Sequence, residues 1–324
     1  MRVFISLLEM HRLSPSKRRW IRYSIVFFIL LYIIALLLTL DNDATLSHLK
    51  EIPLTLYLWL LFFSIVSYLL RFSRWYYFLH PIEASISILK HLLIYVSGFA
   101  LTTTPGKAGE TIRSLFLSPL GIKYHQSVAA FFSERLLDVV SVVTLSIFLF
   151  AWAFSEYQQW VMASAVFIVI AFLLVRSTLI PRLIERFLKH ESKVLLIAFQ
   201  NQVSKFLSNR SLLIAFPLSL MAWLPQGYGL YLIVEAMGFE TSPLLVIGIY
   251  NISMLAGAIS FIPGGIGATE ATISVLLISL GMDASLAVAA SLVCRGMTIW
   301  LAVFLGLISM TVVEKEESAP SSSS

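Results

Sequence analysis

The sequence has little of what soluble enzymes are usually built from. Only 13% of its 324 residues are charged, whereas 58% are apolar, and the mean hydropathy is +0.87. Cys294 is its one cysteine, which excludes intramolecular disulfides and cysteine-based metal sites. The six histidines are scattered without a pair at metal-ligand spacing, and no nucleotide-binding glycine loop occurs. These shortages exclude a hidden soluble domain, and we expect no metal and no cofactor.

Long apolar runs are what the sequence has instead. Runs of about twenty apolar residues are long enough to cross a bilayer as helices. They lie at 23–40, 53–70, 127–152, 160–176, 211–235 and 285–312. Two further apolar segments, 84–120 and 243–281, are interrupted by PGKAGE and PGGIGATE. The pattern predicts an all-α polytopic membrane protein with about six spanning helices and two broken ones.

The distribution of charge predicts the orientation of these helices. Lysines and arginines gather before the first run and in the longest loop, whereas the loops around Glu156 and Glu240 have none. Basic loops are retained in the cytoplasm, so both termini are predicted to be cytoplasmic. The net charge of +5 is therefore interpreted as a signal of orientation and not of nucleic-acid binding. Every basic loop stays inside if each broken segment is a re-entrant hairpin. The alternative, in which each broken segment crosses fully, remains open.

The two broken segments belong to an internal repeat. Placing Glu110 under Glu270, an offset of 270 − 110 = 160, also aligns Gly121 with Gly281, Val128-Ala129-Ala130 with Val288-Ala289-Ala290, and Arg135 with Arg295. The orientation gives the halves, about 53–176 and 211–312, opposite topology. Inverted repeats with paired glycine- and proline-interrupted segments indicate a transport site near the bilayer midplane. We therefore expect one membrane domain over 1–313, followed by a disordered tail over 314–324.

The breaks are predicted to line a cavity, because non-helical backbone at that depth must be satisfied by protein or water. Half-helices beginning near Ala108 and Ala268 would point free N–H groups at a phosphate or carboxylate. Glycines permit close backbone approach, and arginines at mid-membrane depth need a cavity and a partner. The candidate substrate-binding residues are Gly106, Gly109, Glu110, Arg113, Glu134, Arg135, Asp138, Gly264, Gly265, Gly267, Glu270 and Arg295.

Simpler roles for several polar residues stay open. Glu110 and Glu270 could complement a helix dipole, and Arg135 could form a purely structural pair with Asp138. Lys107 and Arg113 are either interfacial anchors or ligands. The hydroxyls of 102–104 are expected to satisfy backbone groups freed by the break. The segment 178–209 is either a helix on the cytoplasmic surface or a linker helix.

The motifs TTPGKAGETIRSLFL with SERLLDVV, and IPGGIGATEATISVLL with GMDASLAVAASLVCRG, resemble the two signature regions of the lysylphosphatidylglycerol synthase transmembrane, or flippase-like, family. The resemblance covers about residues 20–312 and implies a bacterial cytoplasmic-membrane protein that translocates a lipid. No synthase domain follows the last span, so we expect no aminoacyl-lipid synthesis. The resemblance does not define the lipid.

The resulting hypothesis is a non-enzymatic flippase for a lipid with an anionic head group. One alternative is an accessory subunit of a lipid or polysaccharide pathway. Another is an intramembrane lipid-phosphate transferase that uses Glu134, Arg135 and Asp138. The expected partner is the membrane lipid, with pathway enzymes or a second copy of the chain as further possibilities.

Overall fold

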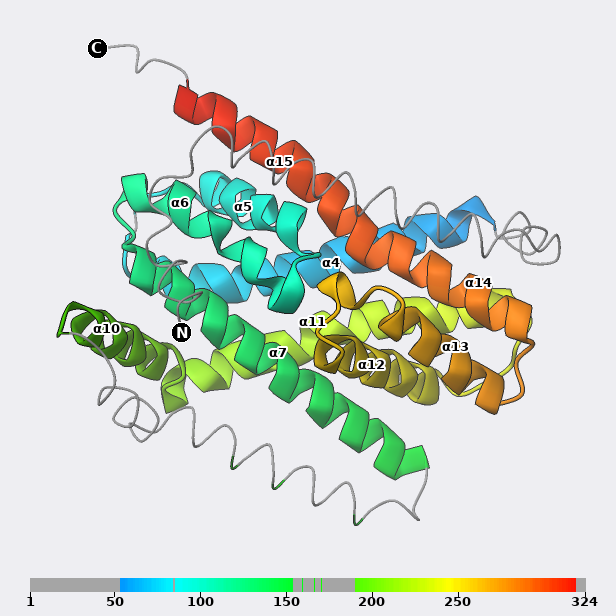
Figure 1. The fold of residues 1–324 in the computed structure, drawn as a ribbon. Helices are drawn as coiled ribbons and strands as arrows, with labels where there is room; N and C mark the ends of the chain where they lie inside the picture. Colours follow the sequence, from blue (N-terminus) through cyan, green and yellow to red (C-terminus); the bar gives the residue numbers. More distant parts are fainter. Residues whose placement is uncertain are drawn as a thin grey trace.

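The computed structural model describes residues 53–83, 85–153 and 190–318, together with the single positions 159, 166 and 170. Within these ranges every regular element is helical and no strand occurs, which confirms the all-α prediction. Figure 1 shows the helices as a bundle of long rods around shorter, broken ones. The predicted span 23–40 lies outside the described residues, as do 160–176 apart from positions 166 and 170, and the whole of 178–189.

The first half begins with the long helix α4 (Leu54–Leu79) and ends with the long helix α7 (Tyr124–Ala153). Between them lie α5 (Ile88–Ser97), the 3-10 turns η1 (Gly98–Leu101) and η2 (Pro105–Ile112), the short helix α6 (Arg113–Leu117) and η3 (Ser118–Leu120). A helical run does begin near Ala108, as predicted, but it is a 3-10 helix that becomes α-helical only at Arg113. Gly106 and Lys107 take left-handed backbone angles, and the chain continues as a 3-10 turn until Arg113.

The second half repeats this order after α10 (His190–Phe206), which is the described part of the predicted surface helix. It comprises α11 (Asn209–Ala236), α12 (Pro243–Ile259), η5 (Pro263–Gly265), α13 (Ala268–Ser279), α14 (Ala284–Arg295), the π-turn η6 (Gly296–Trp300) and α15 (Leu301–Ser318). Here the predicted half-helix from Ala268 is present. Helix α15 continues to Ser318, so residues 314–318 are helical and do not belong to a disordered tail.

By length and apolar composition, two helices of the described ranges can cross a membrane, namely α4 and the continuous rod Ala284–Glu316. A third arises if α10 and α11, which bend by 72° at their junction, are counted together. The predicted runs 53–70, 127–152, 211–235 and 285–312 fall on α4, α7, α11 and the α14–α15 rod. Helix α4 extends nine residues beyond its predicted end at 70.

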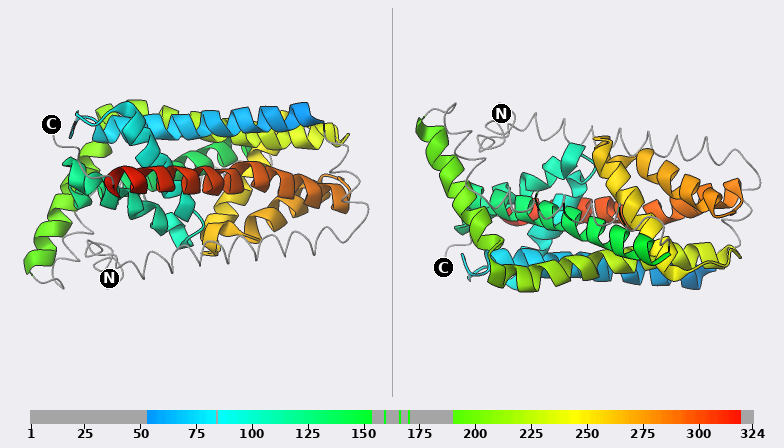
Figure 2. Two further views of the ribbon diagram at one scale, coloured as in Figure 1. Left: turned by 90° about the horizontal axis from the view of Figure 1, so that it is seen from above. Right: turned by 90° about the horizontal axis from the view of Figure 1, so that it is seen from below.

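The two halves run in opposite directions. Helices α4 and α11 lie side by side and antiparallel, with Leu60 against Gly229 and the Ser67 hydroxyl donating to the Ala222 carbonyl at 2.6 Å. Helix α7 likewise runs opposite to the α14–α15 rod (Figure 1). The α5–α6 segment stays at one end of the bundle and α12–α13 at the other (Figures 1 and 2). Both broken segments therefore turn back, as the re-entrant interpretation predicts.

The repeat register also holds in local geometry. Gly121 and Gly281 both take left-handed φ angles, 96° and 98°. The residue after each glycine donates its N–H to the carbonyl five residues earlier, at 3.3 Å and 3.2 Å. The next helix begins three residues after the glycine in both halves. This is the helix ending that favours glycine, because an L-residue is strained there.

Charge separates the two ends of the bundle. The end where α4 finishes and α7 and α11 begin carries Lys90, Lys123, Lys205 and Arg210. The other end carries Glu235, Glu240 and Asp283, and no lysine or arginine among the described residues. The positive-inside bias still predicts that the basic end is cytoplasmic.

Helix α15 holds the first break in place by close packing. Gly306 faces the backbone of Phe99 and Ala100, so closely that a side chain at this position would overlap the Ala100 nitrogen. The Ser309 hydroxyl donates to the Leu93 carbonyl at 2.8 Å one turn further on. The second half of the chain thus supports the broken segment of the first half.

Candidate functional site

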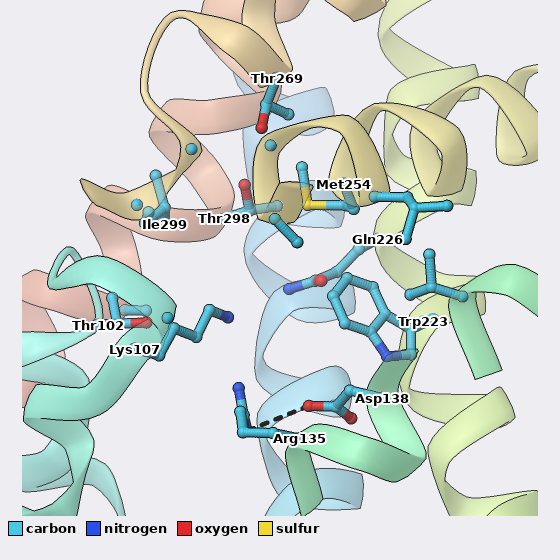
Figure 3. A pocket seen from close by; sticks show the side chains of 18 of the residues that line it. Thr102, Lys107, Arg135, Asp138, Trp223, Gln226, Met254, Thr269, Thr298 and Ile299 are labelled. Atoms are coloured by element: carbon cyan, nitrogen blue, oxygen red, sulfur yellow. Dashed lines mark ion pairs between the residues drawn. The ribbon is translucent and has the colours of Figure 1, made fainter. Parts of the chain in front are cut away.

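A cavity of about 270 Å³ lies where the two breaks meet in the middle of the bundle. Its lining comes from both halves, including residues of α4, η2 and α7 from the first and of α11, α12 and η5 from the second. Figure 3 shows Lys107 and Arg135 pointing into this space, with Gln226 and Trp223 across from them. The sequence-based expectation of a cavity between the breaks is thus met in the structure.

Threonine hydroxyls satisfy the backbone where the first helix breaks. Thr104 accepts a hydrogen bond from the Gly109 N–H at 2.7 Å and donates to the Leu101 carbonyl at 2.8 Å. Thr102 donates to Glu110 at 2.8 Å. Hydroxyl groups can replace lost helical partners at membrane depth, which was their expected role. These threonines therefore supply hydrogen-bond partners for polar groups at the first break.

Beside the cavity, three arginines and three carboxylates form a closed ring of alternating charge. Arg74 contacts Asp138 at 2.9 Å and Glu134 at 3.4 Å, and Arg113 contacts Glu134 at 3.4 Å. Arg113 also contacts Glu110 at 2.5 Å. Arg135 closes the ring, at 4.0 Å from Glu110 and 3.1 Å from Asp138.

The ring links three separate elements of the first half. Arg74 comes from α4, Glu110 and Arg113 from the broken segment, and the other three members from α7. Arg74 and Arg113 are fully buried, and the Arg113 guanidinium also lies 4.1 Å from the Tyr95 ring centroid. A buried charge without a partner is costly, so the ring holds these elements in one arrangement. Its formal charge is zero.

Arg135 is the ring member that reaches the cavity most openly. Its side chain is 18% exposed, whereas those of Arg74 and Arg113 are completely buried. Its Nε has no hydrogen-bond partner among the described residues, although it is buried. The predicted pair of Arg135 with Asp138 is confirmed, and it leaves part of the guanidinium available to a ligand.

The second half keeps only one pair of this network. Arg295 donates from Nε to Glu270 at 3.0 Å and from NH2 to the Gly264 carbonyl at 2.6 Å. Glu270 also accepts from the Gly267 N–H at 2.8 Å and thereby caps α13. The proposed dipole role of Glu270 is thus confirmed. Cys294 and Thr298 stand at the repeat positions of Glu134 and Asp138, so no second ring forms.

Two further cations line the cavity without a carboxylate partner in the described part of the chain, Arg71 and Lys107. Arg71 donates to the side-chain oxygen of Gln226 at 3.2 Å and stacks 4.1 Å from the Trp223 ring centroid. The Tyr250 hydroxyl donates to the same Gln226 oxygen at 3.0 Å. Arg71, Trp223, Gln226 and Tyr250 were not predicted as site residues.

Lys107 combines an unpaired charge with an unfavourable backbone. Its φ angle is 56°, in the left-handed region that a lysine adopts at a cost. The position two residues after the proline of the second break is Gly265, with a φ angle of 65°. Figure 3 shows the Lys107 side chain extending into the cavity, so its ammonium is not an anchor at the bundle end.

One wall of the cavity is apolar and reaches the outer surface of the bundle. It is formed by α7 and by the end of α12, and its lining residues are Val139, Val142, Met254, Leu255, Ala258, Phe261 and Ile262. Val139 is 46% exposed and Phe261 is 79% exposed. In a membrane protein such an exposed apolar surface faces lipid tails. The cavity therefore has a polar interior and an apolar side that reaches the exposed surface of the bundle.

Some of the predicted site residues line the cavity, and others lie outside its lining. Gly106, Glu110, Arg135, Asp138, Gly264, Gly265 and Arg295 line the cavity. Gly109, Arg113, Glu134, Gly267 and Glu270 do not line it. Arg113 is completely buried in the charge ring, so it is not an interfacial anchor. Within the described ranges no group of histidine, cysteine or acidic side chains is placed to hold a metal ion.

Comparison with known proteins gives a family. The sequence profile described as the lysylphosphatidylglycerol synthase TM region matches residues 20–306. The chain belongs to this family and is an integral membrane protein.

Curated relatives include UPF0104 membrane proteins of Pyrococcus horikoshii and Methanocaldococcus jannaschii. The first is 26% identical over 74% of this chain and 82% of its own length, and the second 23% identical over 75% and 80%. A Methanothermobacter thermautotrophicus relative is 36% identical, but over only 35% of this chain and 33% of its own. No solved structure matches. These relatives are archaeal, so the bacterial origin stays a prediction.

Proposed function

We propose that this chain moves a lipid with an anionic head group from one leaflet of its membrane to the other. The observation that carries the proposal is the cavity between the two breaks, whose polar interior holds two cations without carboxylate partners and whose apolar wall opens toward lipid. An amphipathic substrate needs both surfaces at once. The head group would lie against Arg71, Lys107 and Arg135, and the tails would lie along the apolar wall formed by α7 and the end of α12.

The inverted repeat supplies a route for alternating access. Repeats of opposite topology around a central site permit one half to rock against the other, which exposes the site to each leaflet in turn. The charge ring holds the elements of the first half together. In the second half, Arg295 plays this part through its contacts with Glu270 and the Gly264 carbonyl. Since the sequence has no nucleotide-binding loop, transport would be downhill or coupled to an ion gradient.

We favour transport over intramembrane catalysis because of how the carboxylates are held. Glu134 lies between two buried arginines, and Asp138 contacts Arg74 and Arg135. A general acid or base must be free to exchange a proton with a reacting atom, and these carboxylates are held in ion pairs with arginines. We therefore assign the ring a supporting role at the site.

The test is lipid translocation in proteoliposomes made with the purified full chain and fluorescent phosphatidylglycerol or phosphatidic acid. Chemical quenching of the outer leaflet reports the fraction of label that has changed leaflets. We expect transport by the wild type and a loss of at least tenfold in rate for Arg71→Gln. The matched control is Arg210→Gln, an exposed arginine at the end of the bundle. No translocation of any lipid by folded wild type, with or without a proton gradient, would contradict the proposal.

A further inference from the structure

We infer that the cavity prefers a lipid that ends in a phosphate monoester over one whose phosphate carries a further substituent. This inference rests on the proposed function and names the substrate class of the same site. It follows from three features of the cavity: the number and origin of its free donors, its uncompensated charge, and the state of its carboxylates.

Three cationic side chains approach the cavity from three different elements. Arg71 comes from α4, Lys107 from η2 and Arg135 from α7. All three side chains line the cavity, and that of Arg135 is 18% exposed. Lys107 lies within electrostatic range of both arginines and of Glu110 and Asp138, although no carboxylate of the described residues forms an ion pair with it. A phosphate monoester presents three terminal oxygens, one for each donor, whereas a diester presents two.

The formal charge of the site matches a dianion. The ring of three arginines and three carboxylates is neutral, and Arg295 is balanced by Glu270. Arg71 and Lys107 therefore leave two positive charges without a counter-charge in the described part of the chain. A phosphate monoester carries about −1.5 to −2 at neutral pH, whereas a diester carries a single negative charge. With both cations protonated, a monoester neutralises the site, whereas a diester leaves one positive charge.

The carboxylates of the cavity are already occupied, which disfavours a head group that carries an ammonium. Glu110 accepts from Thr102 and contacts Arg113, and Asp138 contacts Arg74 and Arg135. An ammonium would have to compete with these arginines for either carboxylate. The volume of about 270 Å³ also lies just below the range of ordinary ligand pockets, about 300–1,000 Å³, which favours a small head group.

The test measures binding and transport separately on the purified full chain. Binding is measured in lipid nanodiscs with four probes: phosphatidic acid and polyprenyl phosphate as monoesters, and phosphatidylglycerol and lysyl-phosphatidylglycerol as substituted phosphates. We expect at least tenfold tighter binding of a monoester than of phosphatidylglycerol, and the weakest binding for the lysyl lipid. Tighter binding of one monoester than of the other identifies the class of lipid tail.

Substitutions assign the selectivity to the cavity cations. Lys107→Gln is expected to reduce the preference for monoesters to about twofold or less, Lys107→Arg to keep it, and Lys123→Gln, at an exposed lysine before α7, to leave it unchanged. Arg71→Gln tests the same point if Lys107→Gln fails to fold. Equal binding of phosphatidylglycerol and the monoesters, or a preference that survives both glutamine variants, would overturn the inference.

The transport assay separates this inference from the proposed function. If phosphatidylglycerol and the monoesters are translocated at equal rates, the proposed function stands and the inference fails. If a monoester binds selectively but no lipid is translocated, the binding site stands and the transport function fails.

Discussion

Replacing Lys107 with glycine should make the protein more stable while weakening its binding of anionic lipid. Lys107 occupies a left-handed backbone conformation at a φ angle of 56°. That conformation costs an L-residue about 1–2 kcal/mol, a cost that glycine avoids. Glycine in turn loses about 0.5–1 kcal/mol through the greater freedom of its unfolded chain. Lys107→Gly is thus expected to be about 0.5–1 kcal/mol more stable than Lys107→Ala, which lacks the ammonium but keeps the strain.

The equivalent position of the second break allows the reverse substitution. Gly265 has a φ angle of 65°, and a Cβ there would lie 3.0 Å from the Gly257 Cα and 2.8 Å from the Thr269 hydroxyl. Gly265→Ala therefore introduces both the backbone strain and a contact with backbone that cannot easily move. We expect the balance of strain and unfolded-chain entropy to destabilise the protein by about 0.5–1 kcal/mol, as at Lys107, and the contact to add to this if it is not relieved.

Thermal unfolding of the purified variants in one detergent, followed by tryptophan fluorescence, measures these differences. The expected gap between Lys107→Gly and Lys107→Ala is roughly 2 °C in apparent melting temperature. Both variants lack the ammonium and should lose the preference for phosphate monoesters to the same extent. A Lys107→Gly variant that melts below Lys107→Ala would refute the account of strain at the break, whatever the binding data show.

Three other predictions concern the ring, the packing of α15 and the topology. Glu134→Gln leaves two buried guanidinium groups facing a neutral amide, so we expect a loss of about 3–5 kcal/mol, and a melting temperature like that of the wild type would contradict the ring. Gly306→Ala should lower the melting temperature because its Cβ overlaps backbone, whereas Gly296→Ala, which meets nothing within 4 Å, serves as its control. Lys123→Cys and Ser279→Cys, both exposed, should react with an impermeant maleimide from opposite sides of the membrane, since the native cysteine is buried. Labelling of both from one side would exclude the inverted topology.

The architecture could be predicted from sequence because its signals are local. Proline and glycine mark each break, and the left-handed Gly121 and Gly281 recur at the offset of the repeat. The segregation of basic and acidic loops gave the direction of each half. None of these signals depends on how distant segments pack against one another.

The charge ring and the free cations could not be predicted in the same way, because they depend on α4. Arg74 meets Glu134 across 60 positions of the chain and Asp138 across 64. The predicted span ended at residue 70, which left Arg71 and Arg74 outside it. Helix α4 continues to Leu79 and carries both arginines into the bundle. Two arginines three positions apart, directly after an apolar run, were the signal that could have revealed this.

The repeat shows that backbone strain and a positive charge coincide at one position of the first break. Both halves need a left-handed residue two positions after the break proline, and the second half places Gly265 there, where a side chain would collide with α12. The first half has Lys107 at that position, beside a Gly106 around which no atom lies within 4 Å of a built Cβ. Open space makes a side chain possible there, but it does not remove the backbone strain. A residue that is unfavourable for folding, unpaired and directed into a cavity is best explained by what it binds, because strain at functional sites persists where the surrounding structure enforces it.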